Sequence, residues 1–382
     1  MFIDPRSPDS PWHRVLGTQG DVARRVLDVL LTDGPTARTR LADRLGVTTS
    51  SVTKAVRTLT TEGLAEIGPA VVSGTVGRPL QPVSARADEL NVIGCKVVPG
   101  WVLGCRANLM GDVLARGETR IPATTAQWIA TGCLEMARRL DADRPVVGLG
   151  LGVGGTIARD RRTLVLSSAL EATPGQDLVA DIERELGIPV HVENDLRSLV
   201  EMEGRIGVGR HVGSFIMVTL GEGVGACIVD HGHAVTGATG EAGLSQWMTT
   251  LDEDGRLQPG GRLLNTLAIL EQCAARDLPA DLDALIRSAE SGDPQALEVA
   301  DWVVARLVPL LASLVSFTDP QLILLGGELS PLLTPVTDHL AARMAGLVAP
   351  LQRTIPIHIA DWELGDWARG AAVIAVEELL RV

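Results

Sequence analysis

The 382-residue chain lacks the segments that send a protein into or across a membrane. The stretch from Met1 to Trp12 is polar and rich in proline, without the apolar core that a signal peptide needs. No run of about 18 uncharged apolar residues, the length that spans a bilayer, occurs in the sequence. These absences predict a soluble, unexported protein of the cytoplasm with no membrane partner.

Cysteine is scarce, and no two cysteines form a CxxC pair. An odd number of cysteines without such pairs argues against both a disulfide framework and a zinc ribbon. We expect reduced thiols that pack as small hydrophobic side chains. The five cysteines are Cys95, Cys105, Cys133, Cys227 and Cys273.

What the chain does contain fits a globular protein of two or three domains. Hydrophobic residues make up 46% and charged residues 21% of the sequence. The charge is divided unevenly, because residues 11–86 hold ten Lys and Arg against six Asp and Glu, whereas residues 87–382 hold 23 against 39. A slightly basic amino-terminal part on an acidic body suits a protein that touches phosphates with one end only.

Three helices are expected in the amino-terminal part. The first begins at Asp21 and ends at Asp33-Gly34-Pro35. We expect Thr36 to cap a short second helix and Gly46 to follow it with a positive φ. The third helix is expected to begin at Thr48 or Thr49.

The third helix presents a polar face that suits nucleic acid. Hydroxyls can donate to or accept from base edges, and cations neutralise phosphates. A trihelical scaffold for protein contacts is the alternative interpretation. The predicted DNA-contacting residues of this helix are Thr49, Ser50, Ser51, Thr53, Lys54 and Arg57.

The residues after the third helix favour a DNA-binding wing. Residues 63–67 and 70–72 predict two short strands, and the loop Ser73 to Pro79 follows them. Arg78, between Gly77 and Pro79, is expected to enter the DNA minor groove. We therefore predict a winged helix-turn-helix over residues 1–86.

A series of short motifs runs through the amino-terminal part, namely the run from Arg25 to Leu31, Gly34-Pro35, Leu41-Ala42, Leu45-Gly46-Val47-Thr48, Val52-Thr53, Leu59, Glu62-Gly63-Leu64 and Gly77-Arg78-Pro79. With these motifs the sequence resembles the ROK family, which groups bacterial repressors with sugar kinases. The resemblance extends over roughly residues 20–378.

From Asn91 onward, strand-like runs alternate with amphipathic ones, which predicts an α/β body. The family resemblance implies that residues 87–382 form a two-lobed, actin-like (ribonuclease-H-like) ROK domain. The expected strands are 91–98, 146–153, 189–192, 214–219, 226–229 and 321–325, and the expected helices include 127–140 and 177–186.

Val192-Glu193-Asn194-Asp195 resembles the family's sugar-binding motif, in which the Asp is the general base in kinases. The resemblance implies that Asn194 and Asp195 bind an effector; a helix N-cap pair is the alternative. Without a gap Leu244 matches a further sugar-binding Glu of the family, and with a three-residue gap Glu241 matches it. Glu241 and Trp247 complete the predicted effector site.

Departures from the family pattern argue against phosphoryl transfer. Where the family's kinases have an Asp-x-Gly-Gly-Thr phosphate loop, this sequence has Lys96-Val97-Val98-Pro99-Gly100. Glu222 stands at the usual Thr position of the second phosphate loop, Gly221 to Gly225, and places a carboxylate where a phosphate would lie. We therefore expect no catalytic residues.

The family's zinc site is also missing from the sequence. Gly243 to Trp247 replaces the segment with the His ligand, and Gly255 to Leu264 contains no cysteine. His231 and His233 are interpreted as a polar hairpin tip rather than as metal ligands. No metal or other cofactor is predicted.

Taken together, the sequence predicts a sequence-specific transcriptional regulator, a repressor, whose degenerate kinase-like domain senses a small polar or glycosylated effector. The family implies a homodimer or homotetramer that binds an inverted-repeat operator in duplex DNA. A sugar kinase and a purely structural module are the alternative functions.

Overall fold

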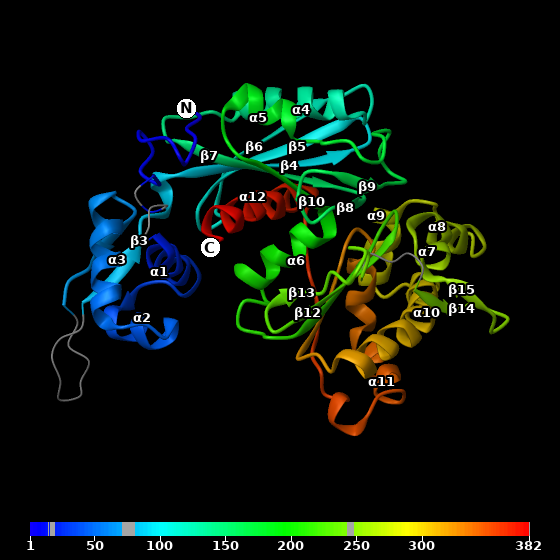
Figure 1. Cartoon of the computed structure of the whole chain (residues 1–382). Coiled ribbons are helices and arrows are strands. Elements are labelled where there is room, and N and C mark those ends of the chain that lie inside the picture. The colour runs from blue at the N-terminus through cyan, green and yellow to red at the C-terminus, as the bar shows by residue number, and fades with distance from the viewer. Residues whose placement is uncertain (14, 16–19, 71–80, 243–247, 382) are drawn as a thin grey trace. The chain divides into compact units, whose positions relative to one another are not determined.

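The computed structural model describes residues 1–13, 15, 20–70, 81–242 and 248–381 (Figure 1). The chain divides into two compact units, residues 1–206 with 365–382 and residues 207–364. Each unit is described separately below.

The first unit contains most of the strands. Its helices are α1 (Gly20–Asp33), α2 (Arg38–Leu45), α3 (Thr49–Thr61), η1 (Ala87–Glu89), α4 (Ala126–Arg139), α5 (Ala180–Leu186), α6 (Asp195–Arg205) and α12 (Leu364–Leu380). Its strands are β1 (Thr36–Ala37), β2 (Ala65–Ile67), β3 (Pro82–Ala85), β4 (Asn91–Val98), β5 (Trp101–Asn108), β6 (Val113–Arg120), β7 (Val146–Val153), β8 (Thr156–Ile157), β9 (Leu164–Leu166) and β10 (Val190–Asn194).

The amino-terminal part of this unit has α1, α2 and α3 beside a three-stranded antiparallel sheet of order β1-β3-β2. The expected limits of α1 and α3 are confirmed, and Gly46 ends α2 with a φ of 63°. The capping role expected for Thr36 is wrong, because α2 begins at Arg38 with Ala37 as its N-cap. Thr36 instead pairs with Val83 as part of β1.

The second strand expected here is also misplaced. Ala70 lies outside any strand and residues 71 and 72 lie outside the described residues. The strand that pairs with β2 is β3, in which Val83 is fully buried. Burial of Val83 between β1 and β2 explains the choice, since a strand is stabilised mainly by what its side chains pack against.

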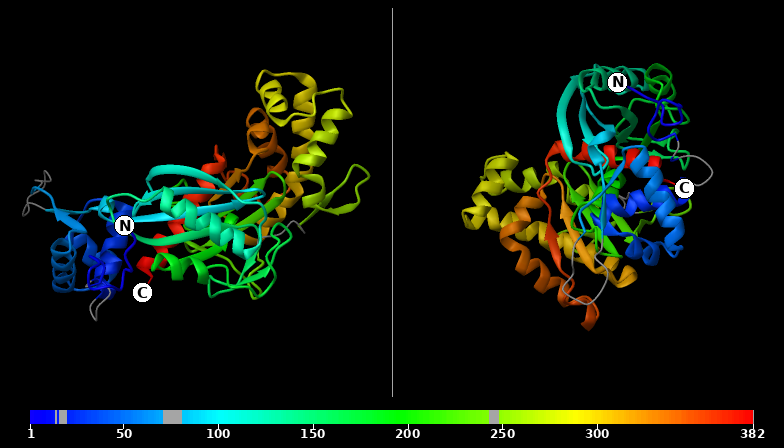
Figure 2. Two further views of the ribbon diagram at one scale, coloured as in Figure 1. Left: turned by 90° about the horizontal axis from the view of Figure 1, so that it is seen from above. Right: turned by 90° about the vertical axis from the view of Figure 1, so that its left-hand side faces the viewer.

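One hydrophobic cluster joins the amino-terminal helices to the rest of the first unit. Leu27 of α1, Val52 of α3 and Val83 of β3 belong to the same cluster as Val92 of β4 and Leu379 of α12. The expected boundary at residue 86 therefore falls inside a continuous core. The left view in Figure 2 shows the blue helices at one end of this unit.

The main sheet of the first unit has the order β10-β7-β4-β5-β6. Strands β4, β7 and β10 run parallel, and β5 and β6 are added antiparallel. A second cluster packs α4 and α5 on one face of the sheet, and α12 covers the other (Figure 1). A Cβ at Gly94 or Gly150 would lie only 1.9 or 1.8 Å from a carbonyl oxygen of α12, so glycine lets this helix pack directly on the strands.

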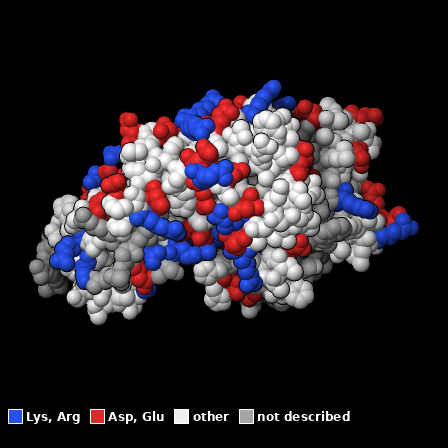
Figure 3. Space-filling view, turned by 45° about the horizontal axis from the view of Figure 1, so that its top comes forward, with Lys and Arg blue, Asp and Glu red and all other residues white. Residues whose placement is uncertain are grey.

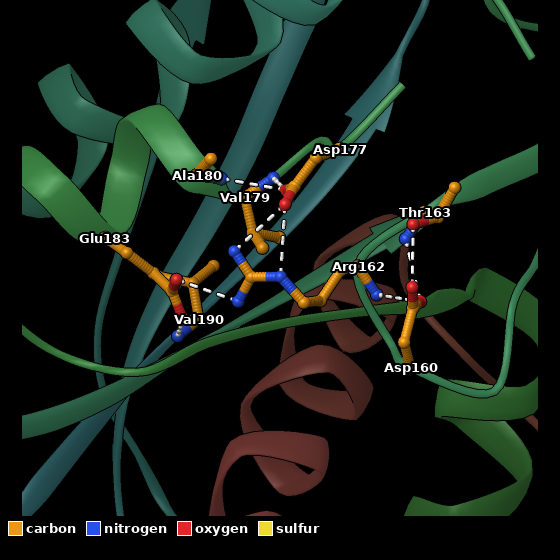
Figure 4. Close-up of polar contacts among 8 residues, drawn as sticks. All are labelled: Asp160, Arg162, Thr163, Asp177, Val179, Ala180, Glu183 and Val190. Atoms are coloured by element: carbon orange, nitrogen blue, oxygen red, sulfur yellow. Dashed lines mark hydrogen bonds and ion pairs between the residues drawn. The ribbon is translucent and has the colours of Figure 1, made fainter. Parts of the chain in front are cut away.

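An arginine fixes the start of α5 to the neighbouring strands. Arg162 donates two hydrogen bonds to Asp177, of 3.1 and 3.0 Å, and one of 2.8 Å to Glu183 (Figure 4). The other oxygen of Asp177 accepts from the backbone N–H groups of Val179 and Ala180. Because Asp177 caps the turn in this way, α5 begins at Ala180 and not at Asp177 as expected.

The second unit packs helices on another mixed sheet, of order β13-β12-β11-β16-β17. Its strands are β11 (Phe215–Leu220), β12 (Val224–Asp230), β13 (His233–Ala234), β14 (Thr249–Leu251), β15 (Leu257–Pro259), β16 (Leu322–Gly326) and β17 (Ile357–Ile359). Its helices are α7 (Gly260–Leu263), α8 (Thr266–Ala274), α9 (Leu282–Glu290), α10 (Pro294–Thr318), η2 (Ser330–Val336), α11 (Thr337–Ala345) and η3 (Pro350–Gln352).

Among the described residues, α10 is the one helix that is long and apolar enough to cross a membrane. Its apolar stretch is 61% buried, and Val303, Leu307 and Leu311 belong to the core of the second unit. The helix therefore has the burial of a core helix.

The structure confirms the expected α/β character of the body and all six strands in outline, with ends shifted by up to two residues. All five cysteines are buried, as the sequence predicts. On the face shown in Figure 3, lysine and arginine side chains are interspersed with aspartate and glutamate.

Candidate functional site

The carboxyl ends of three parallel strands bring the predicted effector residues of the first unit to one edge of its sheet. Lys96 of β4 pairs with Gly152 of β7, and Val153 of β7 pairs with Asn194 of β10. The chain then turns into α6, whose first residue is Asp195. Lys96 and Asp195 thus meet although 99 residues separate them.

Lys96 and Asp195 form an ion pair. The Nζ of Lys96 donates a hydrogen bond to Oδ2 of Asp195, and the two side chains are 9% and 19% exposed. Oδ1 of Asp195 accepts from the backbone N–H of Leu196 at 2.8 Å. Both carboxylate oxygens are therefore occupied by groups of the chain itself.

An aromatic ring completes this environment. The Nζ of Lys96 lies 5.5 Å from the ring centroid of Trp367, on α12. A cation at this distance is attracted to the negative face of the ring. The ammonium is thus held by a carboxylate and by an aromatic face.

Asn194 serves as the N-cap of α6. Its Oδ1 accepts from the backbone N–H of Arg197 at 3.2 Å, and its Nδ2 donates to the carbonyl of Gly155 at 2.9 Å. These are the bonds of the alternative interpretation, a strand-to-helix cap. An effector role for Asn194 stays a prediction.

The remaining predicted effector residues do not lie in the described part of the first unit. Glu241 is exposed and belongs to the second unit. Trp247 and Leu244 lie outside the described residues. The four-residue effector site therefore stays a prediction.

In the second unit, two carboxylates lie together at the expected phosphate loop. Glu222 stands in the turn between β11 and β12, and Glu328 follows β16. Partial burial, together with the charge of Glu222, raises the pKa of Glu328 above its usual value. Gly327, directly before Glu328, has a φ of 91°, and a Cβ there would lie 2.4 Å from the carbonyl oxygen of Leu220, so the turn requires glycine.

The predicted DNA-contacting face of α3 is exposed at five of its six positions, namely Thr49, Ser50, Thr53, Lys54 and Arg57. Ser51 is half-buried, and its backbone N–H and hydroxyl bond Thr48, which caps the helix. Arg78 lies outside the described residues.

The hairpin tip expected at the two histidines is confirmed, because His231 and His233 are exposed at the β12–β13 turn. The part of the chain that the structure describes holds no group of three or more His, Cys, Asp or Glu placed to bind a metal. Because residues 243–247 are outside that part, the expectation of no zinc stays a prediction.

A family model described as "ROK family" matches residues 104–378. The chain belongs to the ROK family. The family match supports the two-lobed, actin-like α/β fold that the sequence resemblance implied.

Relatives of this ROK protein include both regulators and kinases. The DNA-binding transcriptional dual regulator NagC of Escherichia coli is 23% identical over 78% of each chain. A beta-glucoside kinase of Listeria innocua is 26% identical over 64% of this chain and 88% of its own. Sequence similarity alone therefore leaves both activities open.

A solved structure of a ROK family transcriptional regulator, described as a homologue of the Escherichia coli MLC protein, matches with a TM-score of 0.78 at 19% identity. The match covers 95% of this chain and 97% of that one. Because of this coverage, the shared fold includes the amino-terminal helices as well as the ROK domain.

Sequence reasoning identified Lys96 as a departure from ROK kinases but missed its partner. The available signal was Lys96 as the one charged residue of strand β4, because a buried lysine needs an opposite charge. It also missed Trp367 and the effect of the Glu222 charge on Glu328. None of these pairings is visible without the order of the strands.

Proposed function

We propose that this ROK protein is a sequence-specific DNA-binding transcriptional regulator, acting as a repressor, that transfers no phosphate. Its kinase-like domain senses a small polar or glycosylated effector. The amino-terminal helices and small sheet form a winged helix-turn-helix that binds an inverted repeat, and the chain acts as a homodimer or homotetramer.

The observation that carries this proposal is the ion pair of Lys96 with Asp195. A general base must be free to take a proton from the substrate hydroxyl. Here the carboxylate accepts from an ammonium and from a backbone amide. The residue that would act as base in a kinase therefore has a structural partner instead.

The phosphate side of a kinase site is equally unfavourable. Glu222 and Glu328 place two carboxylates at the second loop, and partial burial, followed by the charge of Glu222, raises the pKa of Glu328. An ATP phosphate near them would add more negative charge. This supports a regulator over a sugar kinase.

The α3 face supports DNA as the partner. Thr48 caps the helix through the backbone N–H of Ser51, so the amino-terminal turn is fixed. Five side chains of this helix are exposed, and their hydroxyls and cations suit base edges and phosphates. They are those of Thr49, Ser50, Thr53, Lys54 and Arg57.

The proposal is tested by immunoprecipitating genomic DNA with the purified protein, then measuring affinity for a recovered site at several salt concentrations. We expect Arg57→Ala to weaken binding and to lower the slope of log K against log salt by about one. Arg287→Ala, an exposed arginine on α9, is the control and should bind as the wild type does.

Two outcomes would overturn the proposal. One is recovery of no enriched sites, or equal loss of binding in Arg57→Ala and Arg287→Ala. The other is ATP-dependent phosphorylation of a hexose by the wild type that Asp195→Asn abolishes. Effector sensing is tested by repeating the binding assay with sugars on the wild type and Asp195→Ala.

A further inference from the structure

A cleft of about 360 Å³ lies in the first unit, at the end of the main sheet opposite Asp195. This volume falls within the range of about 300–1,000 Å³ that small-molecule sites occupy. The cleft is lined by Asp88, Asn91, Arg106, Leu114, Ala142, Asp143 and Arg144. None of these residues belongs to the effector site or the DNA-contacting face.

Asn91, the first residue of β4, is a buried polar residue of this cleft. It is 0% exposed, and within the described part of the chain neither its Oδ1 nor its Nδ2 forms a hydrogen bond. A buried amide that forms no hydrogen bond costs the desolvation of both its donor and its acceptor. The amide therefore lowers the stability of the folded protein unless a bound molecule forms hydrogen bonds with it.

Arg106 of β5 lies beside Asn91 on the same face of the sheet. It is opposite Ile93 in the β4–β5 register, two residues along the strand from Asn91. Its Nε is buried without a partner, and among the described residues it forms no ion pair. The cleft thus offers an uncompensated guanidinium next to an unsatisfied amide.

The other charges of the cleft are partly compensated. Arg144 forms an ion pair with Glu89, and Asp88 accepts a 2.7 Å hydrogen bond from Asn108. Asp88 and Asp143 are exposed and keep negative charge at the rim. A guanidinium within and carboxylates outside favour a ligand with a single negative charge over a dianion, which the rim would repel.

We propose that this cleft binds a small monocarboxylate. The carboxylate lies on the guanidinium of Arg106, whose planar fork matches two carboxylate oxygens. The amide of Asn91 donates to the same carboxylate or to a neighbouring polar atom of the ligand. A ligand with an ammonium group gains a further contact with Asp88 or Asp143.

This inference does not rest on the proposed function, because it concerns other residues and needs no DNA. The cleft nevertheless adjoins the connection to the amino-terminal helices, since Asp88 lies in η1, directly after β3. A bound carboxylate therefore has a means to stabilise that connection.

The test is thermal unfolding and calorimetric titration of the full chain with four probes at equal ionic strength. L-alanine and L-lactate carry the carboxylate, with and without the ammonium group; L-alaninamide lacks the carboxylate; inorganic phosphate is the dianion. We expect L-lactate and L-alanine to raise Tm and to bind, and L-alaninamide and phosphate to have no effect. A lower Kd for L-alanine than for L-lactate would assign the rim carboxylates to the ammonium group.

Two variants make the result specific. Arg106→Gln should weaken carboxylate binding at least tenfold, whereas Arg138→Gln, an exposed arginine on α4, should not. Asn91→Leu should raise the Tm of the ligand-free protein and weaken binding, because it removes an unsatisfied buried amide together with a ligand contact. A purely structural Asn91 would give a change in Tm without a change in affinity.

The proposal is overturned if neither carboxylate binds at tens of millimolar, or if phosphate binds and the carboxylates do not. It is also overturned if Arg106→Gln binds them as tightly as Arg138→Gln does. Since Arg106→Gln tests the guanidinium alone, the result stands even if Asn91→Leu does not fold.

Discussion

The two regions that hold the reactive groups in ROK kinases have both changed charge here, but with different consequences. In the first unit a cation, Lys96, has entered and pairs with Asp195. In the second unit a carboxylate, Glu222, has entered and lies near a second one, Glu328. The two charges of the first region therefore cancel, whereas the second region has become more negative.

Under the proposed function, the two changes oppose phosphoryl transfer in physically distinct ways. A matched pair removes the reactive group by satisfying it, at the cost of desolvating two ions. A like-charged pair keeps its groups reactive but repels the anionic substrate. The first change is expected to support the fold, and the second to cost stability.

The largest expected effect comes from breaking the matched pair. Lys96→Met would leave the mostly buried Asp195 carboxylate without its cation, and we expect a loss of about 3 kcal/mol in the free energy of unfolding at pH 7. The measurement is urea denaturation of the first unit's transition in the full chain. Asp195→Asn should also destabilise, because it leaves the ammonium of Lys96 unpaired.

The double variant Lys96→Met/Asp195→Asn isolates the pairing itself. We expect it to lose less than the sum of the two single variants, because no unpaired charge remains. Additive losses would show that the two side chains do not interact, and that Asp195 is free to serve another role.

The pair also shows what sequence alone could supply. The α3 face and the strands of the body follow from local periodicity, and they were predicted with small shifts. The contact of Lys96 with Asp195 depends on the strand order β10-β7-β4, which no local pattern contains. The sequence could only indicate that a lysine in an apolar strand needs a partner.

The misplaced strand and cap have the same origin. The local propensity of Thr36 predicts a cap for α2, but Thr36 pairs with Val83, far along the chain, and so belongs to β1. Likewise, the sequence predicts an ordinary strand start at Asn91. That its side chain has no hydrogen-bond partner among the described residues follows only from the packing. Pairings between distant segments, rather than element types, are what sequence reasoning did not reach.

A like-charged pair in the first unit sharpens the comparison. Burial, followed by the charge of Glu201, raises the pKa of Glu377 on α12 to about 8. Since the ordinary value is 4.5, the folded protein holds this proton between about pH 4.5 and 8 while the unfolded chain does not. The stability that it contributes is complete below pH 4.5 and is lost as pH rises toward 8.

We therefore expect Glu377→Gln to gain stability on the wild type as pH rises, by at most about 1.4 kcal/mol per pH unit and therefore by at most about 3 kcal/mol between pH 5.5 and 7.5. Urea denaturation at pH 5.5, 6.5 and 7.5 measures the difference in the free energy of unfolding between the variant and the wild type. Glu135→Gln, an exposed glutamate on α4, is the control and should follow the wild type. Parallel profiles for Glu377→Gln and the wild type would mean that Glu377 is charged in the folded protein throughout this range.

The smallest expected effect is at the like-charged pair of the second unit, because Glu222 and Glu328 retain contact with solvent, which screens their repulsion. Glu222→Thr restores the family's residue and removes the charge that helps to raise the pKa of Glu328. A raised carboxyl pKa means that stability falls as pH rises above the ordinary value of 4.5, so the variant should be more stable than the wild type at pH 7, by about 0.5 kcal/mol. Its advantage should vanish near pH 4 and shrink in high salt.

Glu222→Gln, which keeps the size of the side chain, is the control and should show the same gain in stability. A gain confined to Glu222→Thr would assign the effect to the backbone turn rather than to charge. If neither variant gains stability at pH 7, the second region is no less compensated than the first, and the contrast between the two sites fails.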